Sequence, residues 1–172
     1  EVYAGLTYSG THTSLASFLP DQTIVITGLS KSHAMTGWRI GYILGPVPFI
    51  KEVVKTHQYM VTSPSSSSEY GALAAMLHGQ GDCDIMKVEY QQRRDYLAKE
   101  LRRLGFEVAS PDGAFYLFAK IPAKCGTDSW AFVRDLAKNA KVALIPGVSF
   151  GPGGEGYVRF SYAASMENLT EV

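Results

Sequence analysis

The sequence predicts a mixed α/β fold, and three observations support this. Two runs dense in apolar and β-branched residues, Thr23–Thr27 and Trp38–Leu44, predict strands on either side of a loop rich in glycine and serine. Further along, apolar residues recur at helical spacing over long segments. After Gly105 the pattern changes to short apolar runs separated by turn residues, which is typical of strands.

The first half of the chain predicts one loop, two strands and two helices. Residues 8–20 are rich in Ser, Thr and Gly and predict a loop, whereas the β-branched density of Thr23–Thr27 predicts a buried strand. Pro46 suits the first turn of a helix, and apolar residues up to Val61 follow at helical spacing. The serine-rich segment 62–68 would suit a linker, but serine is also a strong N-cap, so we expect it to begin a helix over Glu69–His78.

The second half begins with a long helix, predicted over Asp84–Leu104. Its apolar residues form one stripe, its charged residues form a solvated face, and Gly105 ends it. The remaining predicted elements are strands over Phe106–Ala109, Phe115–Ile121, Val142–Ile145 and Tyr157–Tyr162, and a helix capped by Thr127 or Asp128 that runs to Asn139.

The composition argues against several classes of partner. Sixteen basic and sixteen acidic residues give a formal net charge of zero, so nothing favours nucleic acid or an anionic membrane surface. No apolar run approaches the length of a membrane span. Cys83 and Cys125 lie far apart, and the four histidines form no recognisable ligand set, so we expect no metal site and a reduced, cytoplasmic setting.

The loop between the first two predicted strands places a lysine beside groups that suit a phosphate. Residues 28–42 read GLSKSHAMTGWRIGY, so that Arg39 follows Lys31 by eight residues. Small residues let the backbone approach a ligand, serine hydroxyls donate to anions, and a guanidinium grips a phosphate at two points. A lysine amine at a crowded strand end can act as a nucleophile.

This segment resembles the cofactor-lysine segment of the class I and II aminotransferases, which have fold type I and use pyridoxal phosphate. The resemblance implies that Lys31 forms the Schiff base and that Arg39 and Ser30 bind the cofactor's phosphate. The opening residues Glu1-Val2-Tyr3 resemble the family's Asp-Glu-x-Tyr segment. This implies that Tyr3 hydrogen-bonds the phenolic oxygen of the cofactor ring, and that the Asp paired with the ring nitrogen would lie one position before Glu1.

A second charged residue, Arg159, alternates with Val158 and Phe160, so it lies on the opposite face of its predicted strand. A charge on an apolar strand needs a partner or a ligand. The segments PGVSFG over 146–151 and GYVRFS over 156–161 resemble the family's C-terminal motif. The resemblance implies that Arg159 binds the α-carboxylate of the substrate; the alternative is a salt bridge from Arg159 to a helix.

The resemblance runs from Tyr3 to Tyr162 and covers the second half of the family's usual length. It implies the C-terminal part of the pyridoxal-phosphate-dependent transferase fold. Residues 1–46 would supply trailing strands of the large domain's mainly parallel sheet, residues 47–79 connecting helices, and residues 80–172 a small α+β domain. It also implies that the full-length protein is a homodimer, with the helix after the serine-rich segment near the dimer contact.

We therefore expect a pyridoxal-phosphate-dependent aminotransferase that moves an amino group from an amino acid to a 2-oxo acid. The 172-residue chain alone is expected to be inactive, because half of the family's site lies outside it. Two alternatives stay open. A carbon–sulfur β-lyase would use the same residues and release pyruvate and ammonia. An aminotransferase-like domain can also be the ligand-sensing half of a transcription regulator.

Overall fold

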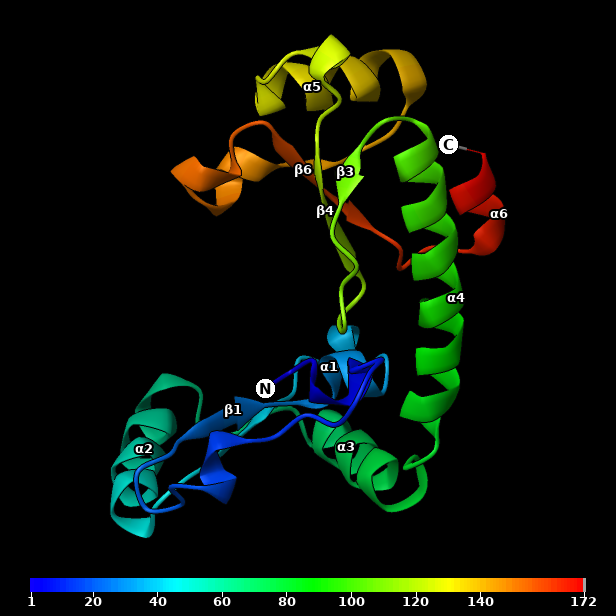
Figure 1. Cartoon of the computed structure of the whole chain (residues 1–172). Coiled ribbons are helices and arrows are strands. Elements are labelled where there is room, and N and C mark those ends of the chain that lie inside the picture. The colour runs from blue at the N-terminus through cyan, green and yellow to red at the C-terminus, as the bar shows by residue number, and fades with distance from the viewer. Residues whose placement is uncertain (172) are drawn as a thin grey trace. The chain divides into compact units, whose positions relative to one another are not determined.

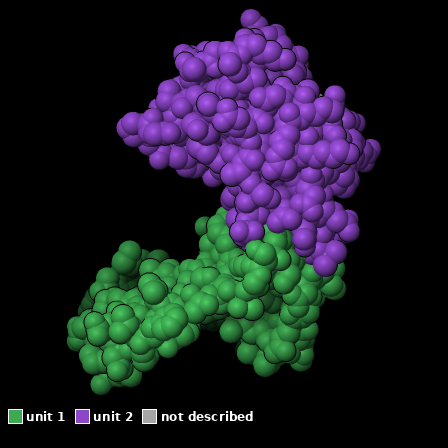
Figure 2. All heavy atoms as spheres, in the orientation of Figure 1, with its two compact units in different colours: residues 1–87 green, residues 88–172 purple. Residues whose placement is uncertain are grey.

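A computed structural model describes residues 1–171 and divides the chain into two compact units, Glu1–Lys87 and Val88–Val172 (Figures 1 and 2). The boundary falls inside helix α4 (Asp82–Arg103), which begins in the first unit and ends in the second. The three-part division at residues 46 and 79 stays a prediction. Among residues 1–171, no helix combines the length and the apolar character that crossing a membrane requires.

The first unit is built around a short strand pair. Strand β1 (Val25–Thr27) pairs antiparallel with β2 (Tyr42–Leu44), with Ile26 opposite Ile43. No parallel pairing occurs among the described residues, so the mainly parallel sheet expected for the large domain stays a prediction. The prediction that the whole first strand is buried is wrong. Val25 is buried, with 8% of its surface exposed, but Ile26 is 65% exposed. In the described residues β1 has β2 as its one strand neighbour, and this leaves one side of β1 open.

The second predicted strand is shorter than expected. Residues Thr36–Trp38 form a turn of 3-10 helix, and Arg39 takes the left-handed conformation, with φ +52°. That conformation is incompatible with an extended strand. The backbone carbonyl of Trp38 accepts a hydrogen bond of 2.7 Å from the Ser68 hydroxyl. The strand therefore begins only at Tyr42, and the residues before it are held as a structured loop.

Two helices follow the strand pair, close to their predicted positions. Helix α2 (Val47–Met60) begins after Pro46, and α3 (Ser66–His78) begins after Ser65, so the serine-rich segment does lead into a helix. Many of their apolar side chains stay exposed, among them Val54 on α2 and Leu73 on α3. The first unit is therefore rich in uncovered apolar surface.

The second unit is an antiparallel sheet packed on helices (Figure 1). Its strands are ordered β3 (Glu107–Val108), β4 (Tyr116–Lys120), β6 (Tyr157–Ser161) and β5 (Ile145–Pro146). Helix α4 ends at Arg103, one residue earlier than predicted, and Gly105 follows it with a φ of +94°, which lets Phe106 N donate to the carbonyl of Leu101. The predicted strand over Val142–Ile145 starts only at Ile145, because Leu136–Ala140 form a π turn that lengthens the preceding helix.

The helix predicted to end at Asn139 is α5 (Ser129–Asp135), extended by that π turn. Asp128 caps it, because its carboxylate accepts a 2.8 Å hydrogen bond from Ala131 N. The chain ends in a short helix, α6 (Met166–Thr170).

The two faces of this sheet differ sharply. Leu117 and Val158 are fully buried, and with Ala119 and Phe160 they face the core that Leu97 and Leu101 of α4 also enter. Successive strand residues point to opposite faces, so Tyr116, Phe118 and Arg159 lie on the outer face. The register confirms this, since Phe118 lies directly opposite Arg159.

Candidate functional site

The loop between β1 and β2 is held by hydrogen bonds that join the residues predicted to bind phosphate. Ser30 and Lys31 lie in α1 (Leu29–Ser32), a single turn that the buried Leu29 anchors. The Thr36 hydroxyl donates to the backbone carbonyl of Ser30 at 2.8 Å. The Arg39 guanidinium in turn donates to the carbonyl of Thr36, also at 2.8 Å. Thr36 therefore links Ser30 to Arg39.

Ser30 and Arg39 share the wall of one cavity. Its volume is about 440 Å³, and the first unit supplies its walls from three segments: Glu1 and Val2, then Ile26, Thr27, Gly28 and Ser30, then Arg39, Ile40 and Gly41. A serine hydroxyl and a guanidinium on one small cavity are the donors that a phosphate monoester requires. The residues present therefore fit the phosphate of the expected cofactor.

Two glycines allow this cavity to form. A Cβ atom built on Gly28 would lie 3.0 Å from the carbonyl oxygen of Ile40, and one on Gly41 would lie 2.8 Å from the carbonyl oxygen of Thr27. Such distances are too short for any side chain, so the two backbone segments can approach only where both residues are glycine. The Ser30 and Arg39 segments are thereby held close together.

Lys31 and Tyr3 are each adjacent in the sequence to a residue that lines this cavity. Lys31 directly follows Ser30 within α1 and is half-buried. Tyr3 directly follows the wall residues Glu1 and Val2, is half-buried, and precedes the 3-10 turn η1 (Ala4–Leu6). The first unit thus carries four of the five predicted site residues: Ser30 and Arg39 in the cavity wall, and Tyr3 and Lys31 next to wall residues in the sequence.

Arg159, the fifth, belongs to the second unit and lies among aromatic rings. Its guanidinium carbon is 4.3 Å from the centroid of the Tyr116 ring and 4.8 Å from that of Phe150. Within residues 1–171 no carboxylate lies at ion-pair distance from Arg159. The alternative of a salt bridge to a helix therefore finds no partner in the described part of the chain.

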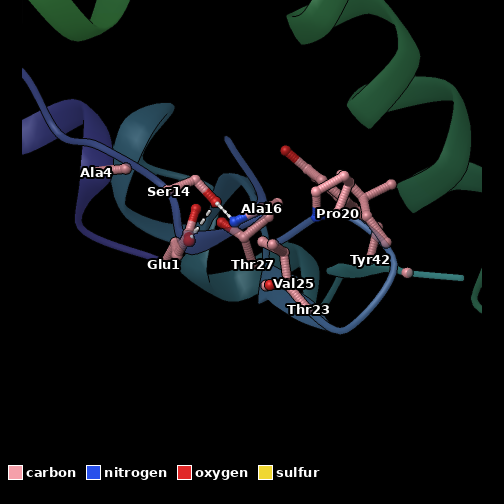
Figure 3. Close-up of a pocket in the computed structure, with 11 residues that line it drawn as sticks. Glu1, Ala4, Ser14, Ala16, Pro20, Thr23, Val25, Thr27 and Tyr42 are labelled. Carbon is pink, nitrogen blue, oxygen red and sulfur yellow. Dashed lines mark hydrogen bonds between the residues drawn. The ribbon is translucent and has the colours of Figure 1, made fainter. Parts of the chain in front are cut away.

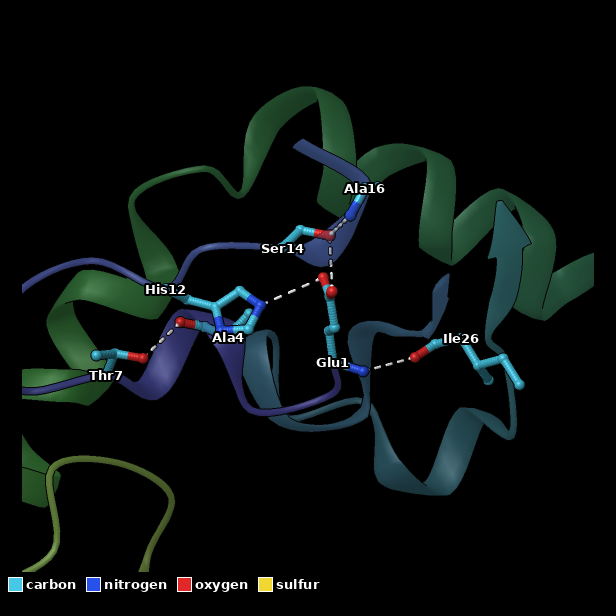
Figure 4. A network of polar contacts seen from close by, with 7 residues as sticks. All are labelled: Glu1, Ala4, Thr7, His12, Ser14, Ala16 and Ile26. Atoms are coloured by element: carbon cyan, nitrogen blue, oxygen red, sulfur yellow. Dashed lines mark hydrogen bonds and ion pairs between the residues drawn. The ribbon is translucent and has the colours of Figure 1, made fainter. Parts of the chain in front are cut away.

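A polar network fixes the start of the chain (Figure 4). The Glu1 carboxylate accepts a 2.7 Å hydrogen bond from the Ser14 hydroxyl and lies 3.3 Å from His12 Nε2, while the Glu1 amine donates to the carbonyl of Ile26. The hydrogen bond from Ser14 lowers the pKa of the Glu1 carboxyl, and His12 acts in the same direction. The segment that carries Tyr3 is thereby tied to β1.

A second cavity of about 470 Å³ lies along β1, with Thr23, Val25, Thr27 and Tyr42 in its wall (Figure 3). Among the residues that line it, Glu1 alone is charged, so no arginine or lysine side chain faces this cavity. This cavity therefore does not suit a phosphate, in contrast to the one lined by Ser30 and Arg39.

The sequence did not single out four residues that the structure places at these sites. Thr36 and Gly41 lie inside the motif of residues 28–42, where the tendency of threonine to bond nearby backbone and the absence of a glycine side chain were the available signals. Phe150 lies inside the motif of residues 146–151 and Tyr116 in a predicted strand, but neither position indicated a contact with Arg159, because that contact depends on strand register and on a distant loop.

Comparison with known proteins identifies the family of this chain. The sequence profile described as "Aminotransferase class I and II" matches residues 1–172. A protein of Bacillus subtilis named "Probable N-acetyl-LL-diaminopimelate aminotransferase" is 48% identical over 171 residues, which are 99% of this chain and 43% of that protein. The aspartate aminotransferase of Geobacillus stearothermophilus is 41% identical, over 98% of this chain and 45% of its own length.

Solved structures of aminotransferases also match this chain. An aromatic aminotransferase from Pyrococcus horikoshii superposes with a TM-score of 0.93 and 39% identity, over 99% of this chain and 47% of its own. The aspartate aminotransferase of Thermus thermophilus with maleate gives a TM-score of 0.91 at 35% identity, over 99% and 44%. The expected α/β fold is thus confirmed, and the chain spans less than half the length of these relatives. It belongs to the aminotransferase class I and II family, whose members generally depend on pyridoxal phosphate.

Proposed function

We propose that the protein containing this chain is a pyridoxal-phosphate-dependent aminotransferase that transfers an amino group from an amino acid to a 2-oxo acid. One observation carries the proposal: Ser30 and Arg39, linked through Thr36, line one cavity, and Lys31 directly follows Ser30 in α1. The family and its named relatives support the same reaction. As in that family generally, we expect the protein to act as a homodimer.

Each site residue has a distinct task in this proposal. Arg39 and Ser30 bind the phosphate through charge-assisted hydrogen bonds. Lys31 Nζ would hold the cofactor covalently. Once the amine of the amino acid has displaced it, the free Lys31 amine would take the proton from Cα as a general base and deliver it to the cofactor as a general acid. Tyr3 donates a hydrogen bond to the phenolic oxygen of the ring. When bound, the cofactor supplies the electron sink that makes this proton removable.

Arg159 has the remaining task, recognition of the substrate. Its planar guanidinium matches the two oxygens of an α-carboxylate, which both the amino acid and the 2-oxo acid carry. Because the two substrates share this group, one arginine can serve both halves of the reaction. Arg159 recognises the carboxylate and not the side chain of the substrate, so the first assays use the classes that relatives are named for: aspartate, aromatic amino acids and N-acetyl-diaminopimelate.

The test uses the full-length protein loaded with pyridoxal phosphate and reduced with borohydride, followed by peptide mass analysis. We expect the mass of the reduced cofactor on the peptide that contains Lys31. Lys31→Ala should lack both this adduct and the visible absorbance of the bound cofactor, whereas Lys51→Ala, at an exposed lysine of α2, should retain both. An adduct that persists in Lys31→Ala would refute the assignment of Lys31.

The products then distinguish the reaction. Formation of a new amino acid from a 2-oxo acid supports transfer, and pyruvate with ammonia from a sulfur amino acid supports β-elimination. A full-length protein with a DNA-binding segment and no turnover would instead support the regulator.

A further inference from the structure

The guanidinium of Arg159 is held by rings rather than by carboxylates. Tyr116 lies on β4 two residues before Phe118, on the same face of the strand, and Phe118 is directly opposite Arg159. Phe150 ends the 3-10 turn η6 (Gly147–Phe150), far from Tyr116 in the sequence. The guanidinium carbon of Arg159 is 4.3 Å from the ring centroid of Tyr116 and 4.8 Å from that of Phe150. Both distances are well inside the range of a cation–π contact.

This arrangement restrains the charge without occupying its donors. A carboxylate partner would accept hydrogen bonds from the N–H groups of Arg159, whereas an aromatic ring attracts the cation through its π electrons and leaves those groups unused. No hydrogen bond joins the Arg159 guanidinium to another residue within 1–171. Its N–H groups therefore stay available for a carboxylate from outside this part of the chain.

The ring of Phe150 is itself restrained. It makes an edge-to-face contact with Phe118, with centroids 5.9 Å apart and planes at 83°. Phe118 in turn stacks on Tyr157 at 5.3 Å, with planes 9° apart. A row of rings across the outer face of β4 and β6 thus supports Phe150, although Phe150 is 52% exposed and would otherwise be free to turn.

We propose that Tyr116 and Phe150 are positioning residues, which hold the Arg159 guanidinium in the orientation that receives a substrate carboxylate. The inference rests on the proposed function, in which Arg159 binds that carboxylate. A long arginine side chain loses considerable rotamer freedom when it binds a ligand, and contacts that fix it beforehand reduce this cost. The two rings should therefore act on carboxylate affinity rather than on the chemical step.

The experiment compares ring-removing and ring-retaining variants of the full-length enzyme. Phe150→Leu and Tyr116→Leu remove the π face at little change in apolar character, while Phe150→Tyr and Tyr116→Phe keep it. We expect each leucine variant to raise KM for the amino acid by about threefold to thirtyfold with kcat nearly unchanged, and each ring-retaining variant to stay near the parent. A primary amine that lacks the carboxylate should react equally well with parent and variants.

Two controls separate this inference from the function on which it rests. In an Arg159→Lys background, Phe150→Leu should have a clearly smaller effect on KM, because the planar guanidinium is gone. If Arg159→Leu leaves KM unchanged, the assignment of Arg159 itself is wrong. If Arg159→Leu raises KM but neither leucine variant does, or if the carboxylate-free amine loses as much as the amino acid, the positioning role is refuted while the proposed function stands.

Discussion

A Cβ atom on Gly28 would lie 2.9 Å from the Cα atom of Gly41, so the backbones at the two ends of the loop between β1 and β2 are in contact. Residues 28 and 41 flank the segment that contains Ser30, Lys31 and Arg39. Any side chain at either glycine would force these two backbone segments apart. The contact therefore fixes the width of the cavity that Ser30 and Arg39 share.

Gly28→Ala and Gly41→Ala should each loosen this site. We expect a stability loss of about 1–3 kcal/mol from overpacking, together with a marked fall in affinity for pyridoxal phosphate. Urea unfolding and cofactor titration of the full-length protein measure the two effects. Gly37→Ala is the matched control, because a Cβ there would meet nothing within 4 Å. Equal behaviour of the three variants would contradict the role of the contact.

Gly71 on α3 offers a prediction about Trp38. A Cβ on Gly71 would lie 2.7 Å from the Trp38 ring, which is 47% exposed and can move aside. Gly71→Ala should therefore displace the ring and shift the fluorescence of Trp38, read as the difference between proteins with and without Trp38→Phe. The neighbouring Arg39 would move with it and bind the phosphate more weakly. Ala74→Ser, at an exposed position of the same helix, should change neither the fluorescence nor the cofactor affinity.

Thr62 carries backbone strain after α2. Its φ is +62°, and its N–H donates to the carbonyl of His57 at 3.2 Å, in the position where a helix usually ends with glycine. Thr62→Gly should raise the free energy of unfolding by about 1 kcal/mol, because a β-branched residue is disfavoured in this region. Thr56→Gly, inside the same helix, should lower it by a few tenths of a kcal/mol. Thermal or urea unfolding distinguishes the two signs.

The two cysteines should differ in reactivity. Partial burial raises the pKa of the Cys83 thiol, and the neighbouring Asp84 carboxylate adds to this effect. Its Sγ also donates to the carbonyl of Gly5 at 3.2 Å, whereas Cys125 is exposed. At neutral pH a maleimide should therefore modify Cys125 first, and the rate at Cys83 should continue to rise at pH values above the ordinary range of a thiol. Peptide mass analysis over time would show the order.

Local patterns in the sequence predicted most of the helices and the loop that contains the candidate site. Helices α2, α3 and α4 and the end of α4 ahead of Gly105 followed from apolar spacing and from capping residues, whose effects act over one or two turns. The motif that contains Lys31 and Arg39 marked the loop in which Ser30 and Arg39 line one cavity, whereas their roles toward a cofactor stay a prediction. These features depend on residues close together in the chain.

What the sequence could not predict depends on contacts between distant residues. Trp38 looked like the start of a strand, but its carbonyl accepts from Ser68, and Arg39 then turns into the left-handed region. The exposure of Ile26 follows from which strands are present beside β1, and no property of that run reports it. The rings around Arg159 likewise meet only through sheet pairing and a returning loop.

The alternation along β6 makes the length of that strand as important as its composition. Val158 is fully buried and Arg159 lies on the opposite face, so deletion of one residue ahead of them within the strand would exchange the two faces. The guanidinium would then enter an apolar core, and an aliphatic side chain would stand where the charge had been. Such a deletion would remove Tyr157 alone and keep Arg159 in the sequence, yet it would take the positive charge away from the outer face of the sheet.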